Sequence, residues 1–345
     1  MSPSNYEPLV ELTRGPIVES VHFGAAAVVD SSGKVLFQAG NIHFNIYLRS
    51  SSKPIQALPF VEAGGVEHYQ LNEKELSILC ASHIGTDEHV KTIQSIQGKV
   101  GFKETDLMCG THPPFHQPTL ENMLREGRPF TPNRHNCSGK HTGFLSFASL
   151  RGDSLEDYLN PQHPIQQVIL RTFAEFCDLT VEKVSIGIDG CTAPVFGVPL
   201  FNSAYAFARF CDPQAWKTGR SNACRKIFHA MTSYPEMVSG PGMFDTRLMQ
   251  VGKGKMIVKC GAEGYQIVGV TPGAFAPDSP ALGIAIKMSD GDNNWRACQV
   301  TALHILYRLG ILNTAQTTDL PEFNTRPLRN WRGIEIGMIR PCFEV

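Results

Sequence analysis

The chain has 345 residues, of which 42% are hydrophobic and 18% charged, as in an ordinary folded protein with a large core. Its formal net charge of −1 argues against nucleic acid or an anionic membrane as the main partner, because both bind basic surfaces. No apolar run approaches the ~20 residues of a membrane helix, and the amino terminus lacks the basic start and apolar stretch of a signal peptide. We therefore expect a soluble, cytoplasmic protein with neither nucleic-acid nor membrane partners.

The ten cysteines are scattered along the chain and include no Cys-x-x-Cys pair. This spacing argues against a zinc ribbon or a thioredoxin-like redox site. In a cytoplasmic protein of this size we also expect no framework of disulfides.

The first predicted elements in chain order are a hairpin and a helix. Apolar runs at Val21–Asp30 and Lys34–Gly40 are joined by a Ser-Ser-Gly turn, which predicts two antiparallel strands. The segment from Lys53 to about Ala63 predicts a helix, because Pro54 is tolerated in a first helical turn.

Cap residues predict two further helices. Asn72 is followed three residues later by Glu75, as in a capping box, and this helix should run to about Ser82. Thr86 should cap the next helix, which should extend to about Ile96.

The remainder of the chain contains amphipathic helices and short apolar runs. Helices are predicted at Pro164–Cys177 and from about Trp295 to Leu309. Four short runs have the composition of strands: Val184–Ile188, Met256–Cys260, Gln266–Val270 and Gly283–Met288.

Strand-forming segments at about 1–71 and 181–345 enclose a helix-rich middle at about 72–180. This order predicts an α/β protein of the α+β type, with one domain over 1–345. Its mixed sheet should be covered by helices, and a helical subdomain should be inserted into it. The elements do not alternate as regular βαβ units and no glycine-rich phosphate-binding motif occurs, so nucleotide binding is not supported.

A candidate nucleophile lies where the helix beginning at Lys53 is predicted to start. In Ser50-x-x-Lys53 the hydroxyl would lie beside the amine on one helical face. A lysine that has lost its proton can act as the base for such a serine, and the helix dipole favours negative charge on the serine oxygen. The alternative is that Ser50 or Ser51 only caps the helix.

Two companion residues favour the catalytic interpretation. Ser82 lies at the predicted end of a helix, and Lys259 ends a strand-like run that leads into Gly261–Gly264. The order of Ser-x-x-Lys, a mid-chain serine and a strand lysine before glycine is that of penicillin-binding serine hydrolases. Each residue has a simpler explanation: Ser82 could bond a backbone carbonyl, and Lys259 could be a surface residue.

Two other patterns imitate catalytic motifs. Ser31-x-x-Lys34 has the same spacing as the candidate pair, but it lies in the predicted hairpin turn, where both side chains would face solvent. Thr86-Asp87 resembles the Thr-Asp pair of asparaginases with a threonine nucleophile, but Thr86 lies where a helix cap is expected.

A polar, glycine-bearing segment at Arg134–Gly143 lies between apolar runs and is typical of a functional loop. Gly187–Thr192 is a second such segment. Cys137 and Cys191, one from each, could bind zinc together with a third ligand from nearby. Cys-x-x-Lys is an unusual metal motif, because the lysine must first lose its proton. The alternative is a pair of buried thiols.

The motifs taken together resemble those of one known family, the Rhizobium etli-type or class 3 L-asparaginases. The resemblance extends over nearly the whole chain. It is carried by Arg49-Ser50-x-x-Lys53-Pro54-x-Gln56, Ala81-Ser82-His83-x-Gly85, Cys109-Gly110-x-His112-Pro113-Pro114, His135–His141, Asp189-Gly190-Cys191, Gly261–Gly264 and Gly283–Gly291.

The resemblance implies a fold similar to serine β-lactamases and penicillin-binding proteins, a homodimer, and hydrolysis of L-asparagine to L-aspartate and ammonia. It also implies roles for individual residues. Ser50 with Lys53 and Ser82 with Lys259 match two serine–lysine pairs; Cys137, Lys140 and Cys191 match zinc ligands; Asp189 lies between metal and substrate; Arg49 and His141 match substrate-binding positions. The zinc would be structural or would orient the substrate, and need not activate water.

Two departures from the expected pattern leave the substrate open. Lys259 is followed by Cys260, where β-lactamase-type enzymes have a small hydroxyl residue, and Met243 stands where we expect a basic residue. One alternative is therefore an amidohydrolase for another amide, such as glutamine, a D-amino-acid peptide or a β-lactam. Another is a zinc-stabilised protein that binds amino acids without turnover.

Overall fold

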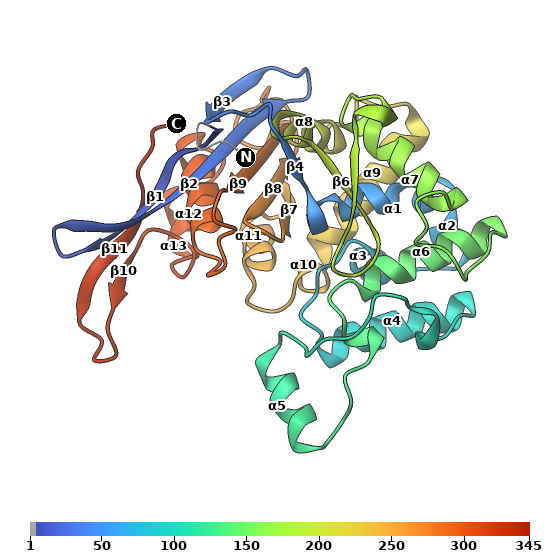
Figure 1. The fold of residues 1–345 in the computed structure, drawn as a ribbon. Helices are drawn as coiled ribbons and strands as arrows, with labels where there is room; N and C mark the ends of the chain where they lie inside the picture. Colours follow the sequence, from blue (N-terminus) through green and yellow to red (C-terminus); the bar gives the residue numbers. More distant parts are fainter. Residues whose placement is uncertain (1–4) are drawn as a thin grey trace. The chain divides into compact units, whose positions relative to one another are not determined.

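The computed structural model of the chain describes residues 5–345 (Figure 1). These residues form two compact units, which are described separately. The sheet unit contains the described residues up to Ser51 together with Val198–Asp212 and Arg247–Val345. The helical unit contains Ser52–Gly197 and Pro213–Thr246. A helical part is thus inserted into a sheet-forming chain, which confirms the predicted α+β class.

An eight-stranded sheet forms the centre of the sheet unit, in the order β10-β11-β1-β2-β9-β8-β7, with β3 paired to β2. Neighbouring strands run antiparallel. The strands are β1 (Glu7–Arg14), β2 (Ile17–Asp30), β3 (Val35–Ala39), β7 (Met256–Gly261), β8 (Tyr265–Val270), β9 (Leu282–Met288), β10 (Arg326–Arg329) and β11 (Glu335–Pro341).

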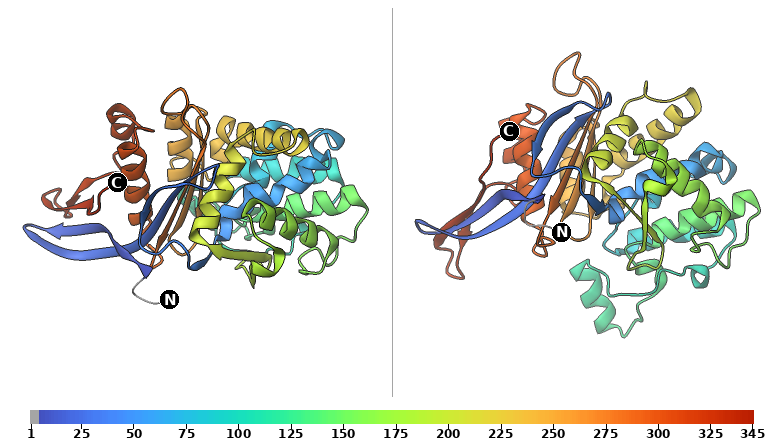
Figure 2. Two further views of the ribbon diagram at one scale, coloured as in Figure 1. Left: turned by 90° about the horizontal axis from the view of Figure 1, so that it is seen from above. Right: turned by 45° about the horizontal axis from the view of Figure 1, so that its top comes forward.

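Helices cover both faces of this sheet, as predicted. Helix α8 (Leu200–Cys211) packs on β2, β8 and β9, and α12 (Ala297–Arg308) packs on β1, β8, β9 and β11. Figure 2 shows the two helices on opposite faces of the sheet. Strands β8 and β9 are buried along their whole length for this reason, and their near-continuous apolar sequences follow from it.

The predicted hairpin is confirmed, and so are the four later predicted strands, which are β5 (Ser185–Ile188), β7, β8 and β9. In the hairpin, Val29 on β2 faces Val35 on β3, and Gly33 in the turn has a φ of 89°, which favours glycine. Strands β7, β8 and β9 lie within a residue of the predicted boundaries.

Strands β1, β10 and β11 were not predicted. Strand β1 pairs with β11, and β11 with β10, so pairing joins the two ends of the chain. The β1–β2 and β10–β11 hairpins form an extended arm of the sheet unit (Figure 1), with Ile17 and Trp331 exposed at their turns. Half of β1, a single residue of β11 and no residue of β10 is buried, which weakens the apolar alternation that a sequence pattern would need.

Helices dominate the second unit. They are α1 (Lys53–Glu62), α2 (Gly65–His68), α3 (Glu73–Leu79), α4 (Asp87–Val100), α5 (Gln117–Arg125), α6 (Ser138–Arg151), α7 (Pro164–Phe176), α9 (Thr218–Ser233) and α10 (Pro235–Val238). Strand β5 (Ser185–Ile188) pairs antiparallel with β6 (Pro194–Pro199). Other elements are β4 (Asn45–Tyr47), α11 (Phe244–Gly252), α13 (Thr314–Thr318) and short 3₁₀ turns.

Both predicted caps are confirmed. Asn72 and Glu75 form a reciprocal capping box at the start of α3. Thr86 Oγ1 accepts the backbone N–H of His89 at the start of α4, so its hydroxyl serves the helix, as the sequence predicts. Helix α3 ends at Leu79, three residues before the predicted end at Ser82, and Ser82 therefore lies in a loop.

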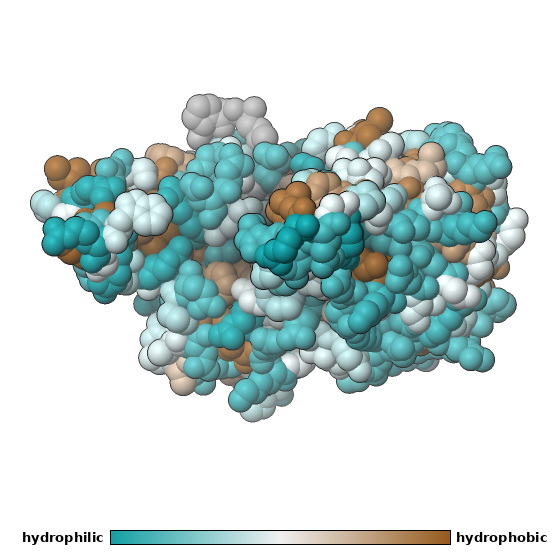
Figure 3. Space-filling view, turned by 90° about the horizontal axis from the view of Figure 1, so that it is seen from below, coloured by the Kyte–Doolittle hydropathy of each residue, from teal (hydrophilic) through white to brown (hydrophobic). Residues whose placement is uncertain are grey.

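Hydrophilic residues cover most of the face drawn in Figure 3, and apolar residues form small separate groups on it. Within residues 5–345 no helix combines the length and apolarity needed to cross a membrane. No disulfide joins the ten cysteines, which all lie within this range, and most of them are buried.

Candidate active site

Ser50 lies in a 3₁₀ turn, Arg49–Ser52, that leads directly into α1. Arg49 has a φ of 52°, in the left-handed region that residues with a side chain rarely adopt. The turn is closed by a hydrogen bond from the Ser51 N–H to the Leu48 carbonyl, at 3.1 Å. Ser50 itself is half-buried, so its hydroxyl lies at a tight, partly accessible turn.

Lys53 is the first residue of α1, and its side chain is buried. Its Nζ donates hydrogen bonds to the Ala81 carbonyl at 2.5 Å, to Ser82 Oγ at 2.8 Å and to Cys137 Sγ at 3.3 Å. The structure therefore brings the candidate base, the second candidate serine and a candidate metal ligand together.

The loop that carries Ser82 is held by its backbone and by Arg134. The Ser82 N–H donates to the Val238 carbonyl at 2.8 Å. The Arg134 guanidinium donates to the Gly85 carbonyl at 2.9 Å and pairs with Asp87. Since Arg134 precedes the Cys137 segment, it ties that segment to the Ser82 loop.

The three residues expected to bind zinc lie together in the helical unit. Cys137 is the cap residue of α6, and Lys140 lies in the first turn of that helix. Cys191 lies in the turn between β5 and β6, and the Lys140 Nζ donates to its Sγ at 2.9 Å. All three side chains are buried.

Charge is balanced within this group. A hydrogen bond from the Cys191 thiol holds the pKa of Cys137 well below its usual value despite burial, and Lys53 and Lys140 add to the effect. The same hydrogen bond raises the pKa of Cys191. Burial alone would lower the pKa of Lys140, but negative charge at the two cysteines and Asp189 raises it. These shifts favour a negative charge at Cys137 beside a positive charge at Lys140.

This donor set fits a zinc ion in its chemistry. Two sulfur atoms and one amine are ligands that zinc accepts, once the bound protons have been released. No three His, Cys, Asp or Glu side chains gather as a metal site within the described part of the chain. A metal held here would therefore need the Lys140 amine as its third protein ligand.

Gly139, between the cap and Lys140, lets α6 approach α3 closely. A Cβ at this position would lie 2.0 Å from the carbonyl oxygen of Ile78 on α3. No side chain fits at that distance, so the glycine sets where the Cys137 and Lys140 side chains lie.

His141 is fully buried next to Lys140. Its Nδ1 is 2.7 Å from the hydroxyl of Tyr158, which in turn accepts the Met108 N–H at 2.8 Å. The other ring nitrogen, Nε2, is buried and has no hydrogen-bond partner. Burial, followed by the charge of Lys140, lowers the pKa of His141, which favours the neutral ring.

Asp189 lies next to Cys191 in the turn between β5 and β6. Its carboxylate accepts the N–H of Gly190 at 2.8 Å, and its backbone closes the turn with Thr192 and Ala193. Thr192 has a φ of 72°, so this turn is locally strained. The side chain is half-buried and can contribute a negative charge beside Lys140.

Lys259 belongs to the sheet unit, on β7 at the end of the strand order. Its side chain is buried and donates to the Cys260 carbonyl at 3.0 Å. Its own carbonyl accepts the hydroxyl of Ser51 at 2.8 Å. Lys259 is thus linked to the turn that carries Ser50, and it is not a surface lysine.

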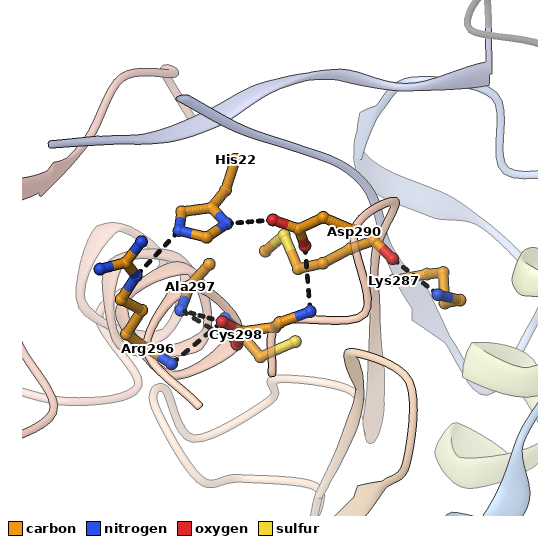
Figure 4. Close-up of polar contacts among 8 residues, drawn as sticks. His22, Lys287, Asp290, Arg296, Ala297 and Cys298 are labelled. Atoms are coloured by element: carbon orange, nitrogen blue, oxygen red, sulfur yellow. Dashed lines mark hydrogen bonds and ion pairs between the residues drawn. The ribbon is translucent and has the colours of Figure 1, made fainter. Parts of the chain in front are cut away.

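Lys287 on β9 supports the turn that follows Lys259. Its Nζ donates to the carbonyls of Glu263 and Met288 at 2.5 and 2.6 Å. Figure 4 shows Lys287 beside a cluster in which His22 bonds Asp290 and Arg296. In the same cluster the Asp292 carboxylate accepts backbone N–H groups at the start of α12.

The predicted site residues fall into two groups. The helical unit brings together Lys53, Ser82, Cys137, Lys140 and Cys191. His141 follows Lys140 in the sequence, and the negative charge of Asp189 raises the pKa of Lys140. Ser50, Arg49 and Lys259 belong to the sheet unit. The pairings of Ser50 with Lys53 and of Ser82 with Lys259 stay predictions, because in each pair the two residues lie in different units.

Three contributors were not singled out from the sequence: Ser51 as the partner of Lys259, Gly139, and Tyr158. A glycine within the Cys-Ser-Gly-Lys motif was a usable signal of close packing. The other two depend on contacts between residues distant in the chain, which leave no local pattern.

Comparison with solved structures gives glutaminases among the matches. A Bacillus glutaminase determined in 4.3 M NaCl is 10% identical, with a TM-score of 0.41, over 84% of this chain and 92% of that one. A probable glutaminase from Bacillus subtilis, complexed with 6-diazo-5-oxo-L-norleucine, is 11% identical, with a TM-score of 0.39, over 82% and 83%. Likenesses this weak carry no argument about the substrate. A sequence search of curated proteins gives no match.

A match to a family model, in contrast, shows the family of this chain. The family model described as L-asparaginase II matches residues 10–341, which is nearly the whole chain. The match includes every predicted site residue in both units. The chain therefore belongs to the L-asparaginase II family of amidohydrolases.

Proposed function

We propose that the protein is an L-asparaginase, which hydrolyses L-asparagine to L-aspartate and ammonia through an ester on Ser50. The observation that carries the proposal is the 2.8 Å hydrogen bond between Lys53 and Ser82, in a chain of this family. A buried lysine amine bonded to a serine, three residues after another serine, is suited to moving protons between hydroxyl groups.

In the first step deprotonated Lys53 takes the proton of Ser50 while the hydroxyl oxygen attacks the side-chain amide carbon. Backbone N–H groups at the start of α1 stabilise the negative charge that develops on the amide oxygen. The proton then passes to the amide nitrogen, directly from Lys53 or through Ser82, with Lys259 as a second source. The carbon–nitrogen bond breaks, ammonia leaves and the β-aspartyl ester remains on Ser50.

In the second step a water molecule attacks the ester carbon. The site's amine takes the water proton, and the carbon–oxygen bond to Ser50 breaks. The serine oxygen recovers its proton and L-aspartate leaves. Both steps use the same bases, so loss of Lys53 should slow both.

Three residues are proposed to bind the substrate. The Arg49 guanidinium offers donors for the substrate carboxylate, and the unpartnered Nε2 of His141 offers another donor. The Asp189 carboxylate suits the α-amino group. Cys137, Lys140 and Cys191 would hold a zinc ion. Its charge would keep the segment around His141 and the Asp189 turn in place.

The experiment that tests the proposal measures ammonia release from L-asparagine, L-glutamine, a D-amino-acid peptide and a β-lactam. It compares the wild type with Ser50→Ala and Lys53→Met. We expect L-asparagine to be the best substrate, and both variants to lose more than about 99% of the activity. A mass measurement after one turnover should find the acyl group on the peptide that contains Ser50.

Other outcomes identify the alternatives. A preference for another amide would keep the mechanism and change the substrate. If calorimetry detects binding of L-asparagine but no ammonia is released, the protein binds amino acids without turnover. Activity above a few per cent in Ser50→Ala would rule out this nucleophile.

We also propose a homodimer, which light scattering in solution tests. The exposed Ile17 and Trp331 on the arm of the sheet unit are apolar surface that a second copy could cover. The cytoplasmic location expected from the sequence stays a prediction.

A further inference from the structure

We propose that Ser51 is a positioning residue, which fixes Lys259 relative to the nucleophile turn through its hydroxyl. The inference rests on the proposed function, because it concerns the alignment of Ser50 with Lys259. The Ser-x-x-Lys motif itself assigns no role to the residue at position 51.

The first observation is the hydrogen bond between Ser51 Oγ and the Lys259 carbonyl. It measures 2.8 Å, joins residues 208 positions apart, and both residues have 0% exposed surface. Strand β7 is the last in the sheet order, so one side of its backbone has no strand partner in that sheet. The Ser51 hydroxyl satisfies the Lys259 carbonyl on that strand, where water cannot reach it.

The second observation is independent of the first. A Cβ placed on Gly261 would lie 2.4 Å from the carbonyl oxygen of Leu48 and 3.1 Å from Ser51 Oγ. The strand therefore approaches the turn so closely that residue 261 must be glycine. Lys259 and Gly261, on either side of Cys260 in β7, thus contact Ser51 and Leu48, which are the two ends of the 48–51 turn.

Ser50 lies inside that turn. The turn is closed by the Ser51 N–H on the Leu48 carbonyl and contains the left-handed Arg49. A change in how the turn sits on β7 must therefore move Ser50 with it. Lys259 is bonded through its own backbone, so the same contact also sets where its side chain starts.

The Ser51 hydroxyl is not a helix cap. Ser52 is the residue at the cap position of α1, and its side chain makes no capping bond. The Ser51 hydroxyl instead donates to the Lys259 carbonyl on β7, 208 positions away in the chain. The alternative in which Ser51 only caps the helix is therefore wrong.

The test compares Ser51→Ala and Ser51→Thr with the matched control Ser221→Ala. Ser221 lies in α9 of the helical unit and is buried, and its hydroxyl donates to the Pro213 carbonyl at 2.6 Å. Its removal thus deletes a similar hydrogen bond away from the proposed site. For each protein the measurements are kcat and KM for L-asparagine across pH, and the rate at which the Ser50 peptide is acylated.

We expect Ser51→Ala to lower kcat and the acylation rate about 10- to 100-fold, with KM within about twofold of the wild type. Its pH profile should shift, because the surroundings of Lys259 change. Ser51→Thr, which keeps a hydroxyl, should recover most of the activity. Ser221→Ala should keep the wild-type kcat and pH profile. Equal losses in the two alanine variants, or no loss in Ser51→Ala, would overturn the inference.

Hydrogen exchange of the peptides that cover 45–52 and 256–261 provides a readout without turnover. Ser51→Ala should speed exchange in both peptides, and Ser221→Ala in neither. If the wild type releases no ammonia and forms no adduct, the proposed function fails. Exchange then still decides whether the Ser51 contact holds β7, and unchanged exchange would overturn it.

Discussion

Lys53 and Ser82 share a hydrogen bond of 2.8 Å within the helical unit. The lysine that is expected to activate Ser50 therefore also holds the second serine of the motif set. Cys137 Sγ accepts from the same nitrogen, so the amine connects the proposed catalytic group to the proposed metal ligands. Each of these hydrogen bonds can be tested by a substitution.

Ser82→Ala should lower kcat about 10- to 100-fold and leave KM nearly unchanged, because in the proposed mechanism the hydroxyl takes part in proton transfer and not in binding. Slow acylation of Ser50 should remain detectable by mass. The control is Ser146→Ala, which removes a buried hydroxyl bonded within α6 to the Thr142 carbonyl. An unchanged kcat in Ser82→Ala would exclude the relay.

Zinc content should follow the Cys191 thiol. The wild type should bind about one zinc ion per chain, and Cys191→Ser should lose most of it, since a hydroxyl is a poor zinc ligand. Cys224→Ser, which alters another buried thiol in α9, should keep the metal. Elemental analysis after dialysis gives the content. Equal zinc in all three proteins would place the metal elsewhere.

Gly139→Ala should destabilise the protein by about 1–3 kcal/mol, because its Cβ would overlap the Ile78 carbonyl oxygen. Gly98→Ala is the matched control in α4, where a Cβ meets nothing within 4 Å. That change should stabilise the protein by up to about 1 kcal/mol. Denaturant titration measures both. A Gly139→Ala protein as stable as the wild type would contradict the close approach of α6 to α3.

Stability should fall as the pH drops through the titration of His89. Burial lowers the pKa of His89 from 6.5 to about 4. Its Nδ1 accepts the Thr86 N–H at 3.1 Å, and its Nε2 donates to the Glu236 carbonyl at 2.9 Å, so the neutral ring is fully bonded. Between pH 6.5 and 4 the unfolded chain binds this proton and the folded protein does not. The free energy of unfolding should therefore decrease by about 3 kcal/mol over this window.

The change His89→Gln removes this titration, so the variant should show a flatter pH dependence of unfolding between pH 6.5 and 4. His229→Gln is the control, because the His229 side chain is 67% exposed. Equal slopes in the two variants would show that another group controls acid unfolding. Unfolding in urea at fixed pH values measures the slopes.

Local patterns predicted much of the fold. The capping residues Asn72 and Thr86 and the Ser-Ser-Gly turn act within a few residues, so their structures follow from nearby chemistry. Strands β10 and β11 depend on pairing with β1 at the opposite end of the chain. Such pairing is decided by the whole fold, and half-buried strands carry a weak alternation.

The site was predictable to the extent that it lies in motifs. Cys137, Lys140 and Cys191 were predicted as a group, and they do meet. The bonds from Lys53 to Cys137 and from Ser51 to Lys259 were not predicted. A lysine side chain reaches several neighbours, and a serine hydroxyl bonds whichever carbonyl the fold brings near it. The residue type alone does not determine which partner is bonded.

The contact between Gly139 and Ile78 also has a mechanical consequence. Helices α3 and α6 are in backbone contact there, so neither can slide or rotate without the other. Ser82 follows the end of α3, and Cys137 and Lys140 begin α6. Ser82 and the proposed metal ligands Cys137 and Lys140 should therefore move as one rigid body, and loss of a bound metal should then displace Ser82 as well as change the charge near it.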